Sequence, residues 1–127
     1  MRVLIADDNS EIRSALGLVL RELWPDCEVE NARDGAEALC LLESRGADLV
    51  LLDWELPGIH APRFTRDLCT RFSACPVIAM SSDPEAREQS LAAGAAYFVG
   101  TSDPPQRLLG LLRSLGSPAP SGSRAEV

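Results

Sequence analysis

Lysine is absent from this sequence: all twelve basic residues are arginine. Histidine occurs once, as His60, and has no neighbour with which it would chelate a metal. The cysteines form no CxxC pair and have no metal-ligand spacing, which favours buried or half-buried thiols in a reducing cytosol over a zinc or redox site. Their positions are Cys27, Cys40, Cys69 and Cys75.

Long apolar runs are also missing, since none reaches the roughly 20 residues that a membrane-spanning helix needs. The first residues, MRVLIADD, form a short apolar run that ends in two acids, unlike a signal peptide. A formal net charge of -7 argues against non-specific binding to nucleic acid or to an anionic membrane, which requires clustered positive charge. The sequence therefore predicts a soluble cytoplasmic protein whose charge is compatible with cations or basic partners.

The length of 127 residues and the hydrophobic content of 46% fit one domain with a single core. Short apolar runs, expected to be strands, alternate with amphipathic segments, expected to be helices. The predicted strands are 3–6, 27–30, 48–52, 76–80 and 97–99, and the predicted helices are 10–22, 34–46, 61–72, 83–94 and 103–115. The residues of the second helix expected to face inward are Ala36, Leu39, Cys40 and Leu42. Residues 1–116 are predicted to form the domain, and the Ser- and Pro-rich residues 117–127 a disordered tail or linker.

The alternation of strands and helices predicts an α/β fold with a parallel sheet and helices on both faces. Such sheets bind ligands at the carboxyl ends of their strands. The residues at those ends are Asp7-Asp8, Asp53, Ser81-Ser82 and Thr101. Carboxylates brought to one edge repel each other, and Mg²⁺, which prefers oxygen ligands, removes the conflict. The sequence therefore predicts a magnesium site with Asp8 and Asp53 as direct ligands and Asp7 holding a metal-bound water.

Each of these residues also has a purely structural interpretation. Asp7-Asp8 alone fits a turn before a helix, and Asp53 fits a turn acid ahead of Pro57-Gly58. Ser81 alone fits a cap for the next helix. Their joint occurrence at three strand ends is much rarer by chance, so the combination favours a chemical site.

Four segments resemble the receiver domains of two-component response regulators: VLIADDN at 3–9, LVLLDWELPG at 49–58, PVIAMSS at 76–82 and AAGAAYFV at 92–99. The resemblance covers about residues 2–116. It implies a flavodoxin-like (βα)5 doubly wound sheet of five parallel strands in the order 2-1-3-4-5. It also implies that Asp53 accepts a phosphoryl group from a sensor histidine kinase, a phosphotransfer protein or a small phosphodonor.

The same resemblance assigns roles to the other residues of the site. Asp7, Asp8, Asp53 and the main-chain carbonyl of Glu55 would hold Mg²⁺. Ser81 would be the switch hydroxyl, and Phe98 would occupy the aromatic switch position, where the side chain turns inward as that hydroxyl moves. An ionised aspartate is a workable nucleophile, and a metal neutralises charge on the transferring phosphoryl oxygens. Beyond self-directed phosphoryl transfer and autodephosphorylation, no enzymatic activity is expected.

Thr101 departs from the receiver pattern. Receivers carry a lysine at the position seven residues after Gly94, where this sequence has Thr101. No lysine elsewhere can replace it, because the sequence has none. Arg87 is a candidate to supply a positive charge to the site from a neighbouring loop. A neutral hydroxyl makes a weaker contact than a charged donor, so phosphoryl binding and its coupling to Ser81 are expected to be weaker. Thr101 also fits an inert strand-end residue.

Two functions follow from this departure. The favoured one is a working but atypical phosphoacceptor, because both metal acids, Asp53 and Ser81 are retained. The alternative is a pseudo-receiver that acts as a phosphorylation-independent protein-interaction module. A flavodoxin-like or hydrolase enzyme has little support, because the sequence has no phosphate-cradling glycine loop and no positioned general base.

The expected output is a population shift of the face formed by the fourth helix, fifth strand and fifth helix. Leu109 or Leu112 is predicted to contribute to a homodimer patch there. The start of the last helix resembles that of receivers attached to helix-turn-helix domains. A DNA-binding output domain is therefore expected if the native chain is longer, with no direct nucleic-acid contact by the receiver itself.

Overall fold

The computed structural model describes residues 1–115, so the prediction of a tail at 117–127 lies outside the described residues. The elements follow in the order β1 (Arg2–Ala6), α1 (Ser10–Leu23), β2 (Glu28–Ala32), α2 (Gly35–Ser44), β3 (Leu49–Asp53), α3 (Ala61–Arg71), β4 (Val77–Ser81), α4 (Glu85–Ala93), β5 (Tyr97–Gly100) and α5 (Pro105–Leu115). The predicted alternation is confirmed, with small shifts at the ends of the elements. Within residues 1–115, no helix is both long and apolar enough to cross a bilayer.

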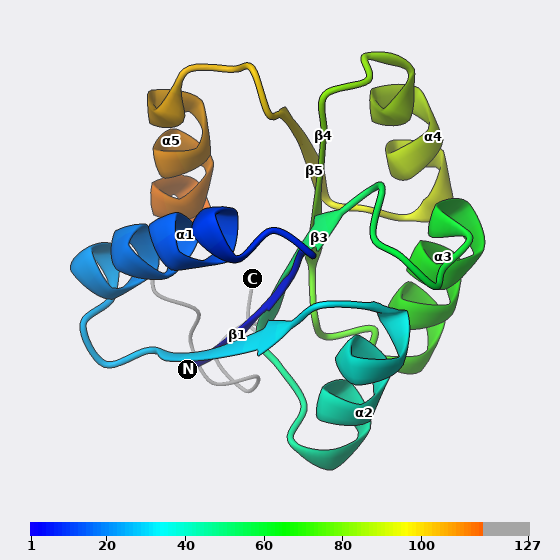
Figure 1. The fold of residues 1–127 in the computed structure, drawn as a ribbon, viewed down its shortest axis with the longest axis horizontal. Coiled ribbons are helices and arrows are strands. Elements are labelled where there is room, and N and C mark those ends of the chain that lie inside the picture. Colours follow the sequence, from blue (N-terminus) through cyan, green and yellow to red (C-terminus); the bar gives the residue numbers. More distant parts are fainter. Residues whose placement is uncertain (116–127) are drawn as a thin grey trace.

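The five strands run parallel in one sheet, in the order β2-β1-β3-β4-β5. This is the predicted flavodoxin-like order. The chain steps from β1 to β2 in one direction and then from β2 across to β3, β4 and β5 in the other. Because crossovers between parallel strands are right-handed, the reversal places α1 and α5 on one face of the sheet and α2, α3 and α4 on the other (Figure 1).

Two apolar layers, one on each face of the sheet, form the core. Successive side chains of a strand point to opposite faces, so β1 sends Leu4 into one layer and Ile5 into the other. Leu4 lies with Leu42 of α2 and Leu68 of α3, whereas Ile5 lies with Leu20 of α1. The central strands are buried on both faces, which explains their nearly continuous apolar sequence.

Polar side chains fix where the helices begin. Asn9 Oδ1 accepts hydrogen bonds from the backbone N–H groups of Glu11 (2.9 Å) and Ile12 (3.1 Å) at the start of α1. Asp34 Oδ1 accepts from the Glu37 N–H (2.8 Å) at the start of α2, which confirms the predicted cap. These bonds satisfy backbone donors that have no partner within a helix. At the end of α4, Gly94 adopts φ 114°, a left-handed conformation that favours glycine.

The inward face of α2 differs from the prediction. Ala38 (1% exposed) and Leu42 (3% exposed) are buried, whereas Ala36 and Cys40 are exposed, so their predicted inward orientation was wrong. Residues 38–42 read ALCLL, and such a continuous apolar run does not define which side of a helix faces the core. Cys40 is consequently an exposed thiol rather than a buried one.

One of the two predicted homodimer leucines on α5, Leu112, also needs correction. Leu112 is 0% exposed and belongs to the core layer beneath α1 and α5, so it cannot form a surface patch. Leu109 is partly buried and lines a cavity together with Val19 and Leu23 of α1. The predicted surface role of Leu112 is therefore wrong, whereas the predicted dimer contact of Leu109 stays a prediction.

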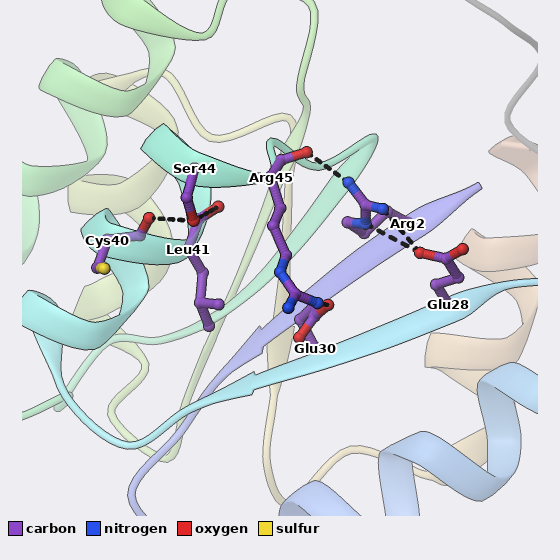
Figure 2. A network of polar contacts seen from close by, with 7 residues as sticks. All are labelled: Arg2, Glu28, Glu30, Cys40, Leu41, Ser44 and Arg45. Atoms are coloured by element: carbon purple, nitrogen blue, oxygen red, sulfur yellow. Dashed lines mark hydrogen bonds and ion pairs between the residues drawn. The ribbon is translucent and has the colours of Figure 1, made fainter.

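The edge strand β2 is bordered by charged side chains at the end of the sheet opposite the carboxyl ends of the strands (Figure 2). Arg2 pairs with Glu28 (2.8 Å) and donates to the main-chain carbonyl of Arg45 (2.5 Å), while Arg45 pairs with Glu30 (2.6 Å). The network joins β1, β2 and the C-terminal end of α2. Exposed ion pairs of this kind contribute little stability, but charges on an edge strand discourage pairing with another chain.

The loop between β3 and α3 is held against the start of α2. The Gly35 N–H donates to the carbonyl of Pro57 (3.0 Å). A Cβ atom added at Gly35 would lie within van der Waals overlap of Ile59, at 2.2 Å from Cγ2, so only glycine allows this approach. The contact fixes the loop that follows Asp53 and carries Glu55.

Candidate functional site at the carboxyl ends of the strands

Polar residues from β1, β3, β4 and β5 converge at one edge of the sheet. Asp7 and Asp8 follow β1, and Asp53 is the last residue of β3. Each of these three side chains offers a carboxylate oxygen, and the oxygens all lie within 4.8 Å of one another. Asp7 is buried, Asp53 is half-buried and Asp8 is exposed. The structure thus brings together the three acids that the sequence predicted as metal ligands.

Burial, and to a lesser extent the neighbouring carboxylates, alters the proton affinity of Asp53 and Asp7. Burial raises the pKa of Asp53 from 3.8 to about 6; the Glu55 N–H bond opposes this rise, and the charges of Asp7, Glu55 and Asp8 add to it. Burial also raises the pKa of Asp7, where the Asn9 N–H and the charge of Arg13 act in the opposite direction. Both shifts mean that negative charge at this edge is costly without a cation.

Backbone donors orient two of the carboxylates. The Asn9 N–H donates to Asp7 Oδ1 (2.9 Å), and the Glu55 N–H donates to Asp53 Oδ1 (3.0 Å). Among the described residues, Asp53 Oδ2 has no hydrogen-bond donor. Asp53 therefore has one oxygen fixed by the loop and one oxygen available to a ligand.

Ser81, the last residue of β4, is 1% exposed, and hydrogen bonds fix the position of its hydroxyl. Its Oγ donates to the carboxylate of Glu55, at 2.8 Å from Oε2 and 3.0 Å from Oε1, and accepts from the Asp83 N–H (3.0 Å). The Glu55 side chain, which comes from the loop after Asp53, thus contacts the Ser81 hydroxyl directly. Sequence reasoning assigned only the main-chain carbonyl of Glu55 to the site.

Thr101 lies at the far side of the same edge, directly after β5. Its N–H donates to the carbonyl of Ser81 (2.9 Å), which joins the ends of β4 and β5. Thr101 is exposed and shares with Asp7 the lining of a cavity of about 340 Å³ between α1 and α5, whose other walls are mostly apolar. Thr101 and Asp7 therefore line the same cavity at this edge.

Phe98 occupies an inward position. The residue is 9% exposed, and its ring belongs to the core layer beneath α2, α3 and α4. It also lines a cavity of about 220 Å³ together with Ser81, Arg87 and Arg107. The Phe98 ring therefore lies inward in this structure.

Two arginines bear on the question of a fixed cation. Arg87 lines the cavity beside Phe98, and the pKa of Asp53 is raised chiefly by burial and by the neighbouring acids, against the Glu55 N–H bond. Arg13, which sequence reasoning missed, donates to the main-chain carbonyl of Asp7 (2.6 Å). Arg13 is the fourth residue of α1, and side chains of a helix tilt toward its N-terminus. This position in the sequence could have indicated that Arg13 reaches back to the end of β1.

The donor set suits a hard divalent cation. Three carboxylates with oxygens within 4.8 Å of one another match the oxygen ligands that Mg²⁺ prefers, and burial, together with the neighbouring acids, raises the pKa values of Asp7 and Asp53. The exposure of Asp8 leaves room for the waters that Mg²⁺ retains. Sulfur and imidazole ligands, which softer metals prefer, are absent from this cluster.

Comparison with known proteins decides the family. Residues 3–113 match the response regulator receiver domain. The chain belongs to this family. The receiver domain is 33% identical to the transcriptional activator protein ExaE of Pseudomonas putida over 115 residues, which cover 89% of this chain and 54% of ExaE. It spans about half the length of ExaE and of two further curated relatives.

Solved receiver structures share the fold. The receiver domain of a DNA-binding response regulator from Colwellia psychrerythraea is 23% identical, with a TM-score of 0.83 over 91% of this chain and 97% of that one. The response regulator TrrA of Thermotoga maritima is 30% identical, with a TM-score of 0.78 over 90% and 97% of the two chains. The TrrA structure is a complex with Mg²⁺ and BeF. This receiver domain is thus a module of two-component signalling.

Proposed function

We propose that this receiver domain accepts a phosphoryl group on Asp53 and uses Ser81 to transmit the change. The observation that carries the proposal is the cluster of Asp7, Asp8 and Asp53, with carboxylate oxygens within 4.8 Å of one another at the carboxyl edge of the sheet. Mg²⁺ would be held by these three side chains and by the main-chain carbonyl of Glu55. When bound, the ion neutralises charge on the phosphoryl oxygens.

Asp53 supplies the nucleophile. With a pKa of about 6, its carboxyl group is mostly ionised at pH 7, as nucleophilic attack requires. The Glu55 N–H holds Oδ1, which leaves Oδ2 to approach the phosphorus atom. A new Oδ2–P bond forms as the donor's P–N or P–O bond breaks, and the imidazole or carboxylate of the donor leaves with the electron pair. The protein contributes mainly positioning and electrostatics.

Ser81 transmits the change because its hydroxyl is fixed by the end of β4 beside the acid cluster. On phosphorylation the hydroxyl would donate to a phosphoryl oxygen, moving the β4–α4 loop that Ser81 Oγ holds through the Asp83 N–H. Phe98, which shares a cavity with Ser81 and already lies inward, would hold the aromatic switch position. The expected readout is a shift in the relative populations of two packings of the α4, β5 and α5 face.

Partners follow from the same proposal. A sensor histidine kinase or a phosphotransfer protein would supply the phosphoryl group. Because the chain spans about half the length of relatives such as ExaE, a DNA-binding output domain is proposed for the native protein if its chain is longer. We also propose that residues 1–116 form one receiver unit and that the protein is cytoplasmic, as its two-component role requires.

Incubation with Mg²⁺ and acetyl phosphate tests the function. Intact-mass measurement should show the gain of one phosphoryl group, and Asp53→Asn should abolish that gain. An equal gain in the Asp53→Asn variant would place the phosphoryl group on another residue.

The alternative, a pseudo-receiver that binds partners without phosphorylation, is favoured by one observation. Thr101 offers a neutral hydroxyl at the edge of the acid site, and the sequence has no lysine that can replace the missing charge. NMR spectra recorded with Mg²⁺ and beryllofluoride separate the two functions. Shift changes that spread from Asp53 to Ser81 and Phe98 support the phosphoacceptor, whereas unchanged spectra at saturating beryllofluoride support the pseudo-receiver.

A further inference from the structure

The hydroxyl of Ser81, which the proposed switch needs, is already hydrogen-bonded to the Glu55 carboxylate. Ser81 Oγ lies 2.8 Å from Glu55 Oε2 and 3.0 Å from Oε1, and these oxygens can only accept. The Asp83 N–H occupies an acceptor position of the same oxygen. A serine hydroxyl has one proton to donate. In this structure the Ser81 hydroxyl donates that proton in its hydrogen bond to the Glu55 carboxylate.

We infer that Glu55 is a positioning residue that restrains the Ser81 hydroxyl until a phosphoryl oxygen on Asp53 displaces its carboxylate. The inference rests on the proposed function and assigns a role to a side chain that the proposal otherwise leaves unused. Glu55 suits the role because its backbone N–H binds Asp53 Oδ1 while its carboxylate binds Ser81. One residue therefore contacts both the acceptor and the switch.

The restraint has a direct energetic consequence. A hydrogen bond to an ionised acceptor is about twice as strong as a neutral one, so transfer of the hydroxyl to a phosphoryl oxygen exchanges one strong bond for another. The gain that drives the switch is then only the difference between the two bonds. The Glu55 side chain is exposed, so its carboxylate can return to water after release. Removal of this competitor should make the switch respond at lower ligand concentration.

Repulsion between two anions offers a different explanation for the same effect. The Glu55 carboxylate is negative, and its removal would favour any anion at Asp53 even without a contact to Ser81. A double-mutant cycle distinguishes the two, because restraint requires the Ser81 hydroxyl and repulsion does not. The matched control for the loss of one charge is Glu22→Ala, at an exposed residue of α1 remote from the acid cluster.

The experiment measures beryllofluoride affinity by NMR on the full chain, at a Mg²⁺ concentration that saturates each variant. Glu55→Ala should raise the affinity by about tenfold, the factor that corresponds to one lost charge-assisted competitor. In the Ser81→Ala background the same substitution should change affinity by less than about twofold, as should Glu22→Ala in the wild-type background. Before beryllofluoride is added, Glu55→Ala should also shift the Asp83 amide, because that N–H donates to Ser81 Oγ.

Three results overturn the inference in recognisable ways. A tenfold gain that persists in the Ser81→Ala background shows that repulsion alone is at work. Equal affinities for Glu55→Ala and Glu22→Ala show that the contact has no influence on binding. Absence of beryllofluoride binding in every variant overturns the proposed function as well, whereas binding by Glu55→Ala alone supports a restraint strong enough to silence the wild-type protein.

Discussion

Replacement of Asp53 by asparagine is expected to stabilise the metal-free protein. Asparagine keeps an oxygen that can accept the Glu55 N–H and removes the charge that burial and the neighbouring acids disfavour. The rise in the pKa of Asp53 from 3.8 to about 6 corresponds to ~3 kcal/mol if taken in full. Because Asp53 is only half-buried, solvent screening reduces this to about 1–2 kcal/mol of unfolding free energy at pH 7.5.

The sign follows from proton linkage. The folded-state pKa of Asp53 is raised above its unfolded value, so the folded protein binds more protons between pH 3.8 and about pH 6. Stability of the wild-type protein therefore falls as pH rises through this window, and the full penalty applies above it. The advantage of Asp53→Asn should shrink by about half between pH 7.5 and pH 5.

Urea unfolding in EDTA, followed by circular dichroism at pH 7.5 and pH 5, measures these differences. Asp67→Asn, at an exposed position of α3, controls for the loss of one negative charge and should change stability by less than about 0.5 kcal/mol. Mg²⁺ at about ten times its dissociation constant should add ~1.4 kcal/mol to the wild-type protein and less to Asp53→Asn, which lacks one ligand. Equal stability of wild-type and Asp53→Asn in EDTA at pH 7.5 would refute the claim that burial and the neighbouring acids make the Asp53 charge costly.

Three further substitutions test other parts of the structure. Leu112→Ala should cost about 2–5 kcal/mol of unfolding free energy because Leu112 is fully buried. The control Leu18→Ala, at a residue 68% exposed, should cost less than about 0.5 kcal/mol. Similar losses for the two variants in urea unfolding would contradict the burial of Leu112. Asp34→Ala should cost about 1 kcal/mol through loss of the α2 cap, and unchanged stability would show that the bond to the Glu37 N–H contributes nothing. Thr101→Lys should raise beryllofluoride affinity by about three- to tenfold by supplying a charged donor, and an unchanged NMR titration would show that the missing cation does not limit binding.

Much of the fold could be predicted from the sequence because its signals are local. The continuous apolar run that ends at Asp53 predicts a buried parallel strand, and Asp34 and Gly94 mark a helix start and a helix end through backbone hydrogen bonding and a left-handed φ. The buried face of α2 was predicted wrongly because its sequence carries no such local signal. A run that is apolar at every position contains no periodicity, so only the position of the helix against the sheet selected Ala38 and Leu42.

The sequence by itself determined which chemical groups arrive at the carboxyl edge, because each follows directly from the end of its own strand: Asp7 and Asp8, Asp53, Ser81 and Thr101. Only the tertiary structure decided how these groups meet. The contact between Glu55 and Ser81 joins residues 26 positions apart, and the turn of the loop after β3 sets it. A side-chain contact of this kind depends on the distance between two backbone segments in the folded protein. No pattern of neighbouring residues in the sequence encodes that distance.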